Sequence, residues 1–140
     1  MNDFEFVFVD ELGKEETIFE KAEFNQYALE KIGLPGASKR FGFVVKDGDA
    51  IIGLVFAKFL FAGLHIKDLV VAKAYRGKGL GSQLLKKAMQ YGKEQGCTFA
   101  YLETLNFQAK DFYHKLGFVV DFERKGFDAG VSQFYMSKKL

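Results

Sequence analysis

The segment that most constrains this chain runs from residue 69 to residue 82, with the sequence LVVAKAYRGKGLGS. Its apolar start, short basic turn and amphipathic continuation predict a strand, a tight turn and a helix. Gly77, Gly79 and Gly81 leave the turn and the first helical positions without side chains. The first N–H groups of a helix lack partners within the helix and carry partial positive charge. The segment therefore predicts an anion-binding site, beside which Arg76 and Lys78 add positive charge.

Length and composition indicate one folded domain over residues 1–140, since 49% of the residues are hydrophobic and 27% are charged. The formal net charge of +2 is too small to indicate nucleic-acid binding. The single cysteine, Cys97, excludes an internal disulfide and a cysteine-rich zinc site, and we expect no metal. The sequence contains neither a signal-peptide pattern nor an uninterrupted apolar run of membrane-spanning length. We therefore expect a cytoplasmic protein without a membrane partner.

Hydrophobic periodicity predicts an order of elements for the whole chain. The expected strands cover residues 4–9, 41–46, 50–61, 65–71, 98–104, 118–124 and 131–138. The expected helices cover residues 15–32, 79–95 and 106–116, the last with Asn106 as its N-cap. The strands on either side of the glycine turn must run parallel, because a helix connects them. This order predicts an α/β fold, with a mixed, mostly antiparallel sheet of about seven strands, a parallel central pair and helices on both faces.

Two other phosphate-binding folds compete for the glycine turn. A dinucleotide-binding fold requires a glycine where this chain has Ser82, and an acidic residue about 20 positions later, where Glu103 stands. The glycine spacing and the antiparallel first half argue against that fold. A nucleotide-hydrolysing P-loop requires Gly-Lys-Ser or Gly-Lys-Thr, which the turn does not supply. A nucleotide-binding module remains one alternative.

The segment RGKGLG at residues 76–81 fits the Arg/Gln-x-x-Gly-x-Gly/Ala signature, and the chain resembles the GCN5-related N-acetyltransferase (GNAT) family. Residues 69–71 resemble the end of that family's fourth strand. Residues 102–104, with Asn106, Ala109 and the segment FYHKLGF at 112–118, resemble its second signature. The resemblance extends over the whole chain because the order of elements also matches.

This resemblance implies transfer of an acetyl group from acetyl-CoA to a primary amine of a small molecule or peptide, by direct attack in a ternary complex. Backbone N–H groups of residues 77–82 would hold the cofactor pyrophosphate. Main-chain groups of residues 69–71 would bind the pantetheine arm, and one N–H would polarise the thioester carbonyl. The implied cofactor-binding residues are Leu69, Val70, Val71, Arg76, Gly77, Lys78, Gly79, Leu80, Gly81, Ser82, Asn106 and Ala109.

Two residues are candidates for proton transfer. The resemblance implies that Tyr113 protonates the departing thiolate, and a phenol pKa near 10 is close enough to a thiol pKa of about 8.5 for that role. The alternative for Tyr113 is a packing role. Glu103, at the end of a strand, is a candidate general base; it is equally well explained as a solvated charge or a lysine partner, with water as the base. Strand alternation places His65 on the same face as Leu69, too deep for chemistry, and Asp68 on the opposite face.

The acceptor amine is not identified by the sequence. Residues 15–36 and 125–133 correspond to the segments that build the acceptor pocket in the family. Apolar residues of the final hairpin, Phe127, Phe134 and Tyr135, suit either a wall of that pocket or the contact of a homodimer. The main alternative to an enzyme is a non-catalytic acyl-CoA-binding sensor or regulatory module with the same fold.

Overall fold

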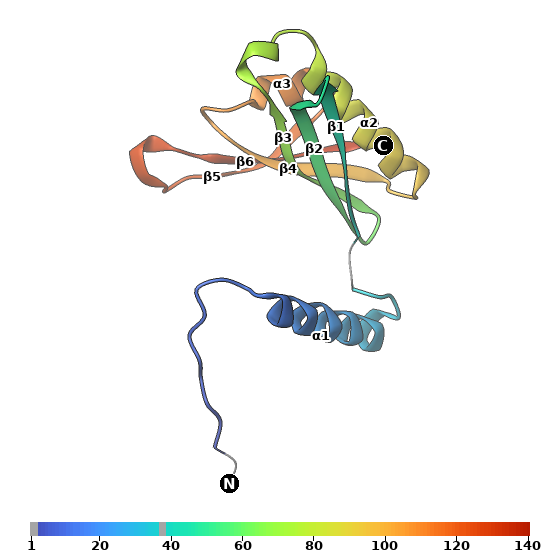
Figure 1. Cartoon of the computed structure of the whole chain (residues 1–140), viewed down its shortest axis with the longest axis vertical. Coiled ribbons are helices and arrows are strands. Elements are labelled where there is room, and N and C mark those ends of the chain that lie inside the picture. Colours follow the sequence, from blue (N-terminus) through green and yellow to red (C-terminus); the bar gives the residue numbers. More distant parts are fainter. Residues whose placement is uncertain (1–2, 37–38) are drawn as a thin grey trace. The chain divides into compact units, whose positions relative to one another are not determined.

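The computed structural model describes residues 3–36 and 39–140. The chain divides into two compact units, residues 1–37 and 38–140 (Figure 1). The expectation of a single domain over residues 1–140 stays a prediction.

The first unit contains the helix α1, Lys14–Ile32, close to the predicted range of 15–32. Acidic Glu15 and Glu16 lie in its first turn and Lys31 lies in its last turn, as the helix dipole favours. Gly33 ends the helix with a left-handed φ of 73°, and its N–H donates to the Leu29 carbonyl.

The predicted strand at residues 4–9 is wrong, because the structure assigns no strand there. Alternating aromatic and β-branched residues fit a pleated surface, yet a strand forms only where a neighbour accepts its backbone hydrogen bonds. Among residues 3–36, α1 is the only regular element, so residues 4–9 have no strand to pair with in their unit.

The second unit holds a six-stranded sheet in the order β1-β2-β3-β4-β6-β5 (Figure 1). Its strands are β1 (Arg40–Asp47), β2 (Ala50–Leu60), β3 (Gly63–Val71), β4 (Phe99–Leu105), β5 (Val119–Arg124) and β6 (Gln133–Lys139). Its helices are α2 (Leu80–Glu94) and α3 (Lys110–Lys115), with short 3-10 turns η1 (Lys73–Tyr75) and η2 (Asp128–Gly130). Only β3 and β4 are parallel, which confirms the predicted mixed sheet and central pair. The described residues contain six strands rather than about seven, since residues 4–9 form none.

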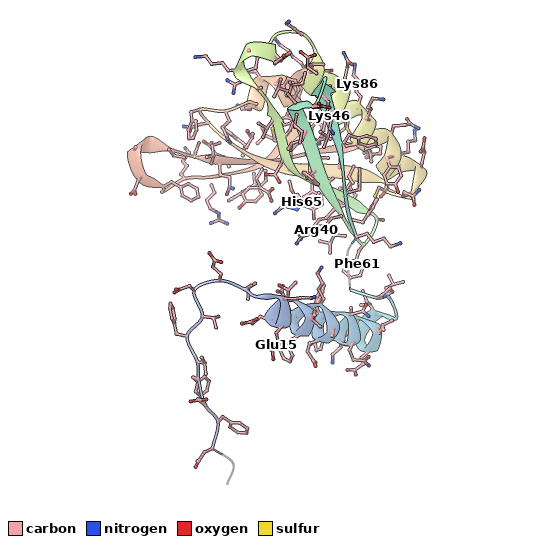
Figure 2. The ribbon with its side chains drawn as sticks, viewed as in Figure 1. Glu15, Arg40, Lys46, Phe61, His65 and Lys86 are labelled. Carbon is pink, nitrogen blue, oxygen red and sulfur yellow. The ribbon has the colours of Figure 1, made fainter. Side chains whose placement is uncertain are left out.

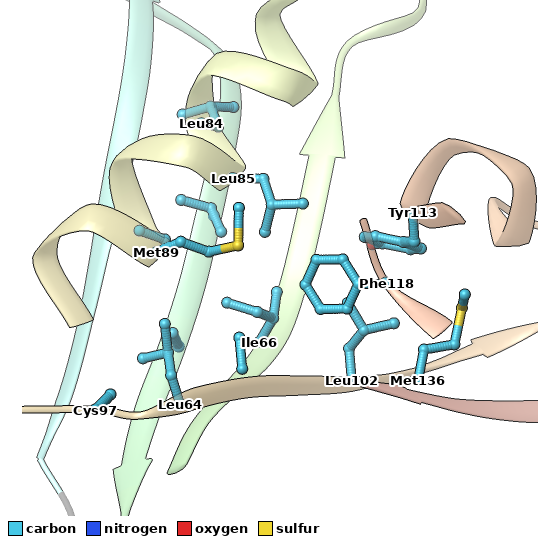
Figure 3. Close-up of a cluster of buried hydrophobic side chains, with 14 residues drawn as sticks. Leu64, Ile66, Leu84, Leu85, Met89, Cys97, Leu102, Tyr113, Phe118 and Met136 are labelled. Carbon is cyan, nitrogen blue, oxygen red and sulfur yellow. The ribbon is translucent and has the colours of Figure 1, made fainter. Parts of the chain in front are cut away.

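The core lies between one face of this sheet and the helices α2 and α3 (Figure 3). Leu85 of α2, Leu102 of β4, Met136 of β6 and Phe118 are almost fully buried in it. Burying a side chain of this size contributes roughly 1.5–3 kcal/mol. These contacts fix α2, and with it the glycine turn, against the sheet. A helix on the opposite face stays a prediction.

The strands β3 and β4 pair over only three residues each before they separate. Residues 63–65 pair with residues 99–101, and no later residue of either strand appears in the ladder. On its other side β3 stays paired with β2 as far as Val71. The Ala72 N–H donates to the Ile52 carbonyl of β2, so by alternation the main-chain groups of Leu69 and Val71 point away from β2. They face the side on which β4 separates from β3, beyond His65 and Tyr101. We call the region between the two separated strands the β3–β4 opening.

A β-bulge in β3 changes which side chains face the core. Ile66 pairs with Ala57 and Asp68 pairs with Phe56, so Lys67 is an extra residue. Before the bulge Leu64 and Ile66 are buried in the core, and after it Leu69 and Val71 pack against the core. His65 therefore lies on the opposite face from Leu69 and Val71, and the expectation that it shares their face is wrong.

Candidate active site

A cavity of about 400 Å3 lies where β3 passes through the glycine turn into α2, and we call it the glycine-turn cavity. Its walls include the residues of the predicted anion site and one aromatic ring from α3: Val71, Tyr75, Arg76, Gly77, Gly79, Leu80, Gly81, Ser82 and Phe112. Leu69, Val70 and Lys78 do not line it, and the main-chain groups of Val70 face β2. Eight of the nine lining residues come from one continuous segment, residues 71–82, and the ninth, Phe112, comes from α3.

Glycine is required in this turn by the backbone itself. Gly77 and Gly79 have φ values of 79° and 81°, in the left-handed region that other residues enter at a cost. Gly79 is the N-cap of α2 and offers no side chain, so the first N–H groups of the helix stay available to a ligand. A Cβ on Gly81 would already be in van der Waals contact with Phe112 and Val71, at 3.6 and 3.8 Å. The α2 start, the end of β3 and α3 thus converge on the cavity.

The basic side chains of the turn are held by neighbouring groups. Arg76 Nε donates to the Val71 carbonyl at 3.0 Å, which ties the turn to the end of β3. Lys78 Nζ lies 5.6 Å from the centre of the Tyr75 ring. The Tyr75 hydroxyl donates to Asp47 at 2.6 Å, and this hydrogen bond raises the tyrosine pKa. Arg76 therefore shapes the cavity, while the Lys78 ammonium rests against an aromatic ring beside it.

Asn106 and Ala109 line a second cavity of about 410 Å3, which shares Phe112 with the first. Asn106 is not the N-cap of α3, because that helix begins at Lys110 after Ala109. Instead, the Asn106 amide donates to the Gly130 carbonyl at 3.1 Å, and its backbone N–H donates to the Ser132 carbonyl. Asn106 thus ties the end of β4 to the loop before β6. Its contact with a cofactor stays a prediction.

Tyr113 projects from α3 into the core, where its ring packs edge-on against Phe112 and Phe118 (Figure 3). Its hydroxyl has no hydrogen-bond partner among the described residues, yet no side-chain polar atom in that set is both fully buried and unpaired. The hydroxyl therefore reaches an accessible surface. Burial raises the pKa of Tyr113. The phenol stays protonated at neutral pH, which suits a proton donor.

Glu103 lies on the other face of the sheet, just beyond the residues of β4 that pair with β3. Its Oε2 lies 2.7 Å from Nε2 of His65, a strand neighbour on β3 (His65 is labelled in Figure 2). The contact follows from the parallel register, in which His65 pairs with Tyr101 and Glu103 lies two residues further along β4 on the same face. Sequence reasoning missed the pair because neither the register between β3 and β4 nor the bulge that puts Leu69 on the face opposite His65 has a local sequence signal. The structure thus brings a carboxylate and an imidazole together at the β3–β4 opening.

The model of the acetyltransferase (GNAT) family matches residues 6–118 of this chain. The chain belongs to the GNAT acetyltransferase family. This confirms the resemblance inferred from the two sequence signatures.

The chain is similar to several named acetyltransferases of this family. It is 33% identical over 78 residues to the blasticidin-S acetyltransferase of Streptomyces morookaense, a match that covers 55% of this chain and 57% of that protein. The chain thus spans little more than half of that relative. It is 25% identical over 125 residues to the thialysine N-epsilon-acetyltransferase of Sus scrofa, covering 78% of this chain and 73% of that one.

Solved structures of GNAT acetyltransferases share the fold. An acetyltransferase from Bacillus cereus aligns with a TM-score of 0.78 and 29% identity, covering 96% of this chain and 98% of the other. A protein assigned as a streptothricin acetyltransferase from Bacillus anthracis aligns with a TM-score of 0.66 and 27% identity, covering 79% and 66%. The latter structure contains acetyl coenzyme A, the co-substrate of GNAT acetyltransferases.

Within residues 3–36 and 39–140, no group of three or more His, Cys, Asp and Glu side chains is placed to hold a metal ion. None of the helices in the same residues is long and apolar enough to cross a membrane.

Proposed function

We propose that this protein is an acetyl-CoA-dependent N-acetyltransferase that acetylates a primary amine of a small molecule or peptide. The observation that carries the proposal is the β3–β4 opening, which has the glycine-turn cavity at one end and Glu103 at its edge. Acetyl-CoA supplies the acetyl group as an activated thioester. The protein's own task is to bind that thioester, to orient an amine beside it and to move protons.

The residues of the glycine-turn cavity fit a diphosphate. Free N–H groups at the start of the 15-residue helix α2 and left-handed glycines are the donors that phosphates use in proteins. The outward main-chain groups of Leu69 and the outward N–H of Val71 are suited to the amide groups of a pantetheine arm, as an added strand would be, while the Val71 carbonyl already accepts from Arg76. Support for these assignments is the geometry of the turn and the edge together with family membership.

Tyr113 and Glu103 divide the proton transfers between the two faces of the sheet. Glu103 takes a proton from the acceptor ammonium, so that the neutral nitrogen attacks the carbonyl carbon. A C–N bond forms, the C–S bond breaks, and Tyr113 donates its proton to the departing sulfur. The second proton lost by the nitrogen restores Tyr113 by way of solvent, and Glu103 releases the first proton to solvent. Attack and departure thus use different groups on different sides of the opening.

The chemistry of the acceptor follows from its place in this reaction. A primary amine is required. Relatives named blasticidin-S and streptothricin acetyltransferases support a small molecule, and a relative named N-alpha-acetyltransferase 30 supports a peptide. The apolar side chains of the final hairpin leave a homodimer as a further prediction. A cytoplasmic location also stays a prediction from the sequence.

The test is release of free thiol from acetyl-CoA in the presence of a panel of amines. The panel should hold aminoglycosides, nucleoside and peptide antibiotics, polyamines, lysine analogues and N-terminal peptides, with mass spectrometry of each product. We expect amine-dependent thiol release and a product that carries one added acetyl group. Tight binding of coenzyme A by calorimetry, without turnover on any amine, would instead identify an acyl-CoA sensor. Tighter binding of NAD or ATP than of coenzyme A would contradict the proposal altogether.

A further inference from the structure

The pair formed by His65 and Glu103 is the one close contact between an imidazole and a carboxylate in the described residues. The two residues lie 38 positions apart in the chain and come from the neighbouring strands β3 and β4. The His65 side chain is 11% exposed and the Glu103 side chain is 31% exposed. The imidazole is therefore enclosed, while the carboxylate reaches solvent.

Neighbouring strands fix the position of the imidazole. The His65 ring stacks on the Tyr101 ring, with centroids 4.4 Å apart and planes within 7° of parallel. Burial, and secondarily the charge of Glu103, raise the pKa of Tyr101. Lys58 of β2 lies opposite His65 in the ladder, and Tyr135 of β6 lies opposite Glu103. The imidazole cannot rotate without losing the stacking contact.

The two carboxylate oxygens of Glu103 have different surroundings. Oε2 is bound by His65, whereas Oε1 accepts no hydrogen bond from any other described residue. A carboxylate on an open strand end normally rotates among several rotamers. Anchoring one oxygen leaves the other in a defined direction. A carboxylate that is already held in the reactive orientation need not be ordered before each proton transfer, so the proton transfer is faster.

We propose that His65 is the positioning residue of Glu103, holding Oε2 so that Oε1 faces the acceptor ammonium. This inference rests on the proposed function. In the proton transfer, an N–H bond of the ammonium breaks and an O–H bond forms at Oε1, while the His65 hydrogen bond to Oε2 is kept. His65 itself does not touch the substrate.

Three variants separate positioning from a merely structural contact. His65→Phe keeps a flat ring on Tyr101 but removes the donor to Glu103, and His65→Gln keeps an amide N–H at a similar distance. His114→Gln is the matched control, since His114 is the only other histidine and is exposed on α3. With the amine found in the thiol-release screen, we expect His65→Phe to lower kcat about 10- to 100-fold. We expect His65→Gln to recover activity to within about threefold of the wild type, as a held hydrogen bond requires.

The measurement includes Kd for acetyl-CoA by calorimetry and the thermal midpoint of each variant. Both should stay close to wild type in His65→Gln, and Kd should also be unchanged in His65→Phe. In a Glu103→Gln background, His65→Phe should cause no further loss of kcat, because the two residues act as one unit.

The outcomes distinguish the two proposals. Full activity of His65→Phe in an active wild-type enzyme overturns the positioning role and leaves the acetyltransferase proposal intact. Equal losses in both His65 variants, with an equal fall of the thermal midpoint, show a structural contact and also overturn the positioning role. If the wild type turns over no amine, the proposed function fails and the positioning role fails with it.

Discussion

The two sides of the β3–β4 opening are built from different parts of the chain. The glycine-turn cavity is lined mainly by residues of one continuous segment, Val71 to Ser82, which holds three glycines and the first N–H groups of α2. The His65–Glu103 pair consists of two side chains from separate strands, and it exists because the parallel register pairs His65 with Tyr101, two residues before Glu103 on the same face of β4. The first side depends on backbone conformation, and the second depends on strand register.

This difference separates binding from turnover in the proposed enzyme. Main-chain donors at a helix start recognise a phosphate whatever the neighbouring side chains are, so changes there should act on cofactor affinity. A general base acts through one carboxylate, so changes there should act on the chemical step. If the two sides are independent, a substitution on one side changes cofactor affinity without changing turnover, and a substitution on the other side does the reverse.

The largest effect is expected for Glu103→Gln, which keeps the shape of the side chain but removes its basicity. We expect kcat/KM to fall about 10²- to 10³-fold, with the Kd for acetyl-CoA unchanged. Steady-state kinetics and calorimetry measure the two quantities. Glu123→Gln on the edge strand β5 is the control, since it makes the same change in the same sheet away from the opening. A large rise in Kd with Glu103→Gln would contradict the separation of the two sides.

A smaller loss is expected for Tyr113→Phe, which removes one hydroxyl from a ring held in the core. We expect kcat to fall about tenfold or more, with little change in Kd, because only the departing sulfur loses its proton donor. Tyr91→Phe is the control, since that ring also packs among aromatic rings, 4.7 Å from Phe41. Burial raises the pKa of Tyr113, so wild-type kcat should show no loss from tyrosine ionisation below about pH 10. Equal kcat in Tyr113→Phe and wild type would remove Tyr113 from the mechanism.

The strand, the glycine turn and the start of α2 could be predicted from the sequence, because the residues that specify them are neighbours in the chain. Three alternating glycines, a basic turn and an amphipathic pattern within 14 residues (69–82) predicted the strand, the turn and the helix start. The parallel pair followed from the connection through α2. Each of these inferences uses residues that are close together in the chain.

The His65–Glu103 pair could not be predicted, because it depends on the register between two strands that are far apart in the chain. Bringing His65 to Glu103 requires the register between β3 and β4, and placing Leu69 on the opposite face from His65 requires knowing that Lys67 is unpaired. The same reason accounts for the wrong strand at residues 4–9, whose alternating pattern carries no information about a pairing partner. Asn106 was misplaced because a better partner, the Gly130 carbonyl, comes from a segment 24 residues away.

A moderate effect on binding is expected for Gly77→Ala, compared with Gly96→Ala. Both glycines have left-handed φ values, 79° and 98°, and a Cβ on either would meet no atom within 4 Å. Both substitutions should therefore lower the free energy of unfolding by about 1–2 kcal/mol, the cost of that conformation. Only Gly77 lines the glycine-turn cavity, so only Gly77→Ala should also raise the Kd for coenzyme A, by about tenfold. Equal affinities in the two variants would show that the turn does not bind the cofactor.

The smallest effect concerns the alkaline titration of the two tyrosines that lie on opposite faces of the opening. Burial raises the pKa of both Tyr101 and Tyr113, and the charge of Glu103 raises that of Tyr101 further. Since the folded-state pKa exceeds the unfolded value of 10.0, the unfolded chain loses these protons first. The contribution of the two protonated tyrosines to the free energy of unfolding is therefore complete below about pH 10. It is lost as the pH rises through their pKa values in the folded protein.

Glu103→Gln removes the nearby negative charge, so Tyr101 should ionise at lower pH in that variant than in the wild type, while Tyr113 should not change. Ultraviolet titration of the wild type, Glu103→Gln, Tyr101→Phe and the double variant assigns the ionisation by difference. If Glu103→Gln moves the ionisation equally with and without Tyr101, the charge of Glu103 acts across the sheet. The two sides of the opening would then share one electrostatic environment, and their separation into a binding side and a turnover side would not hold.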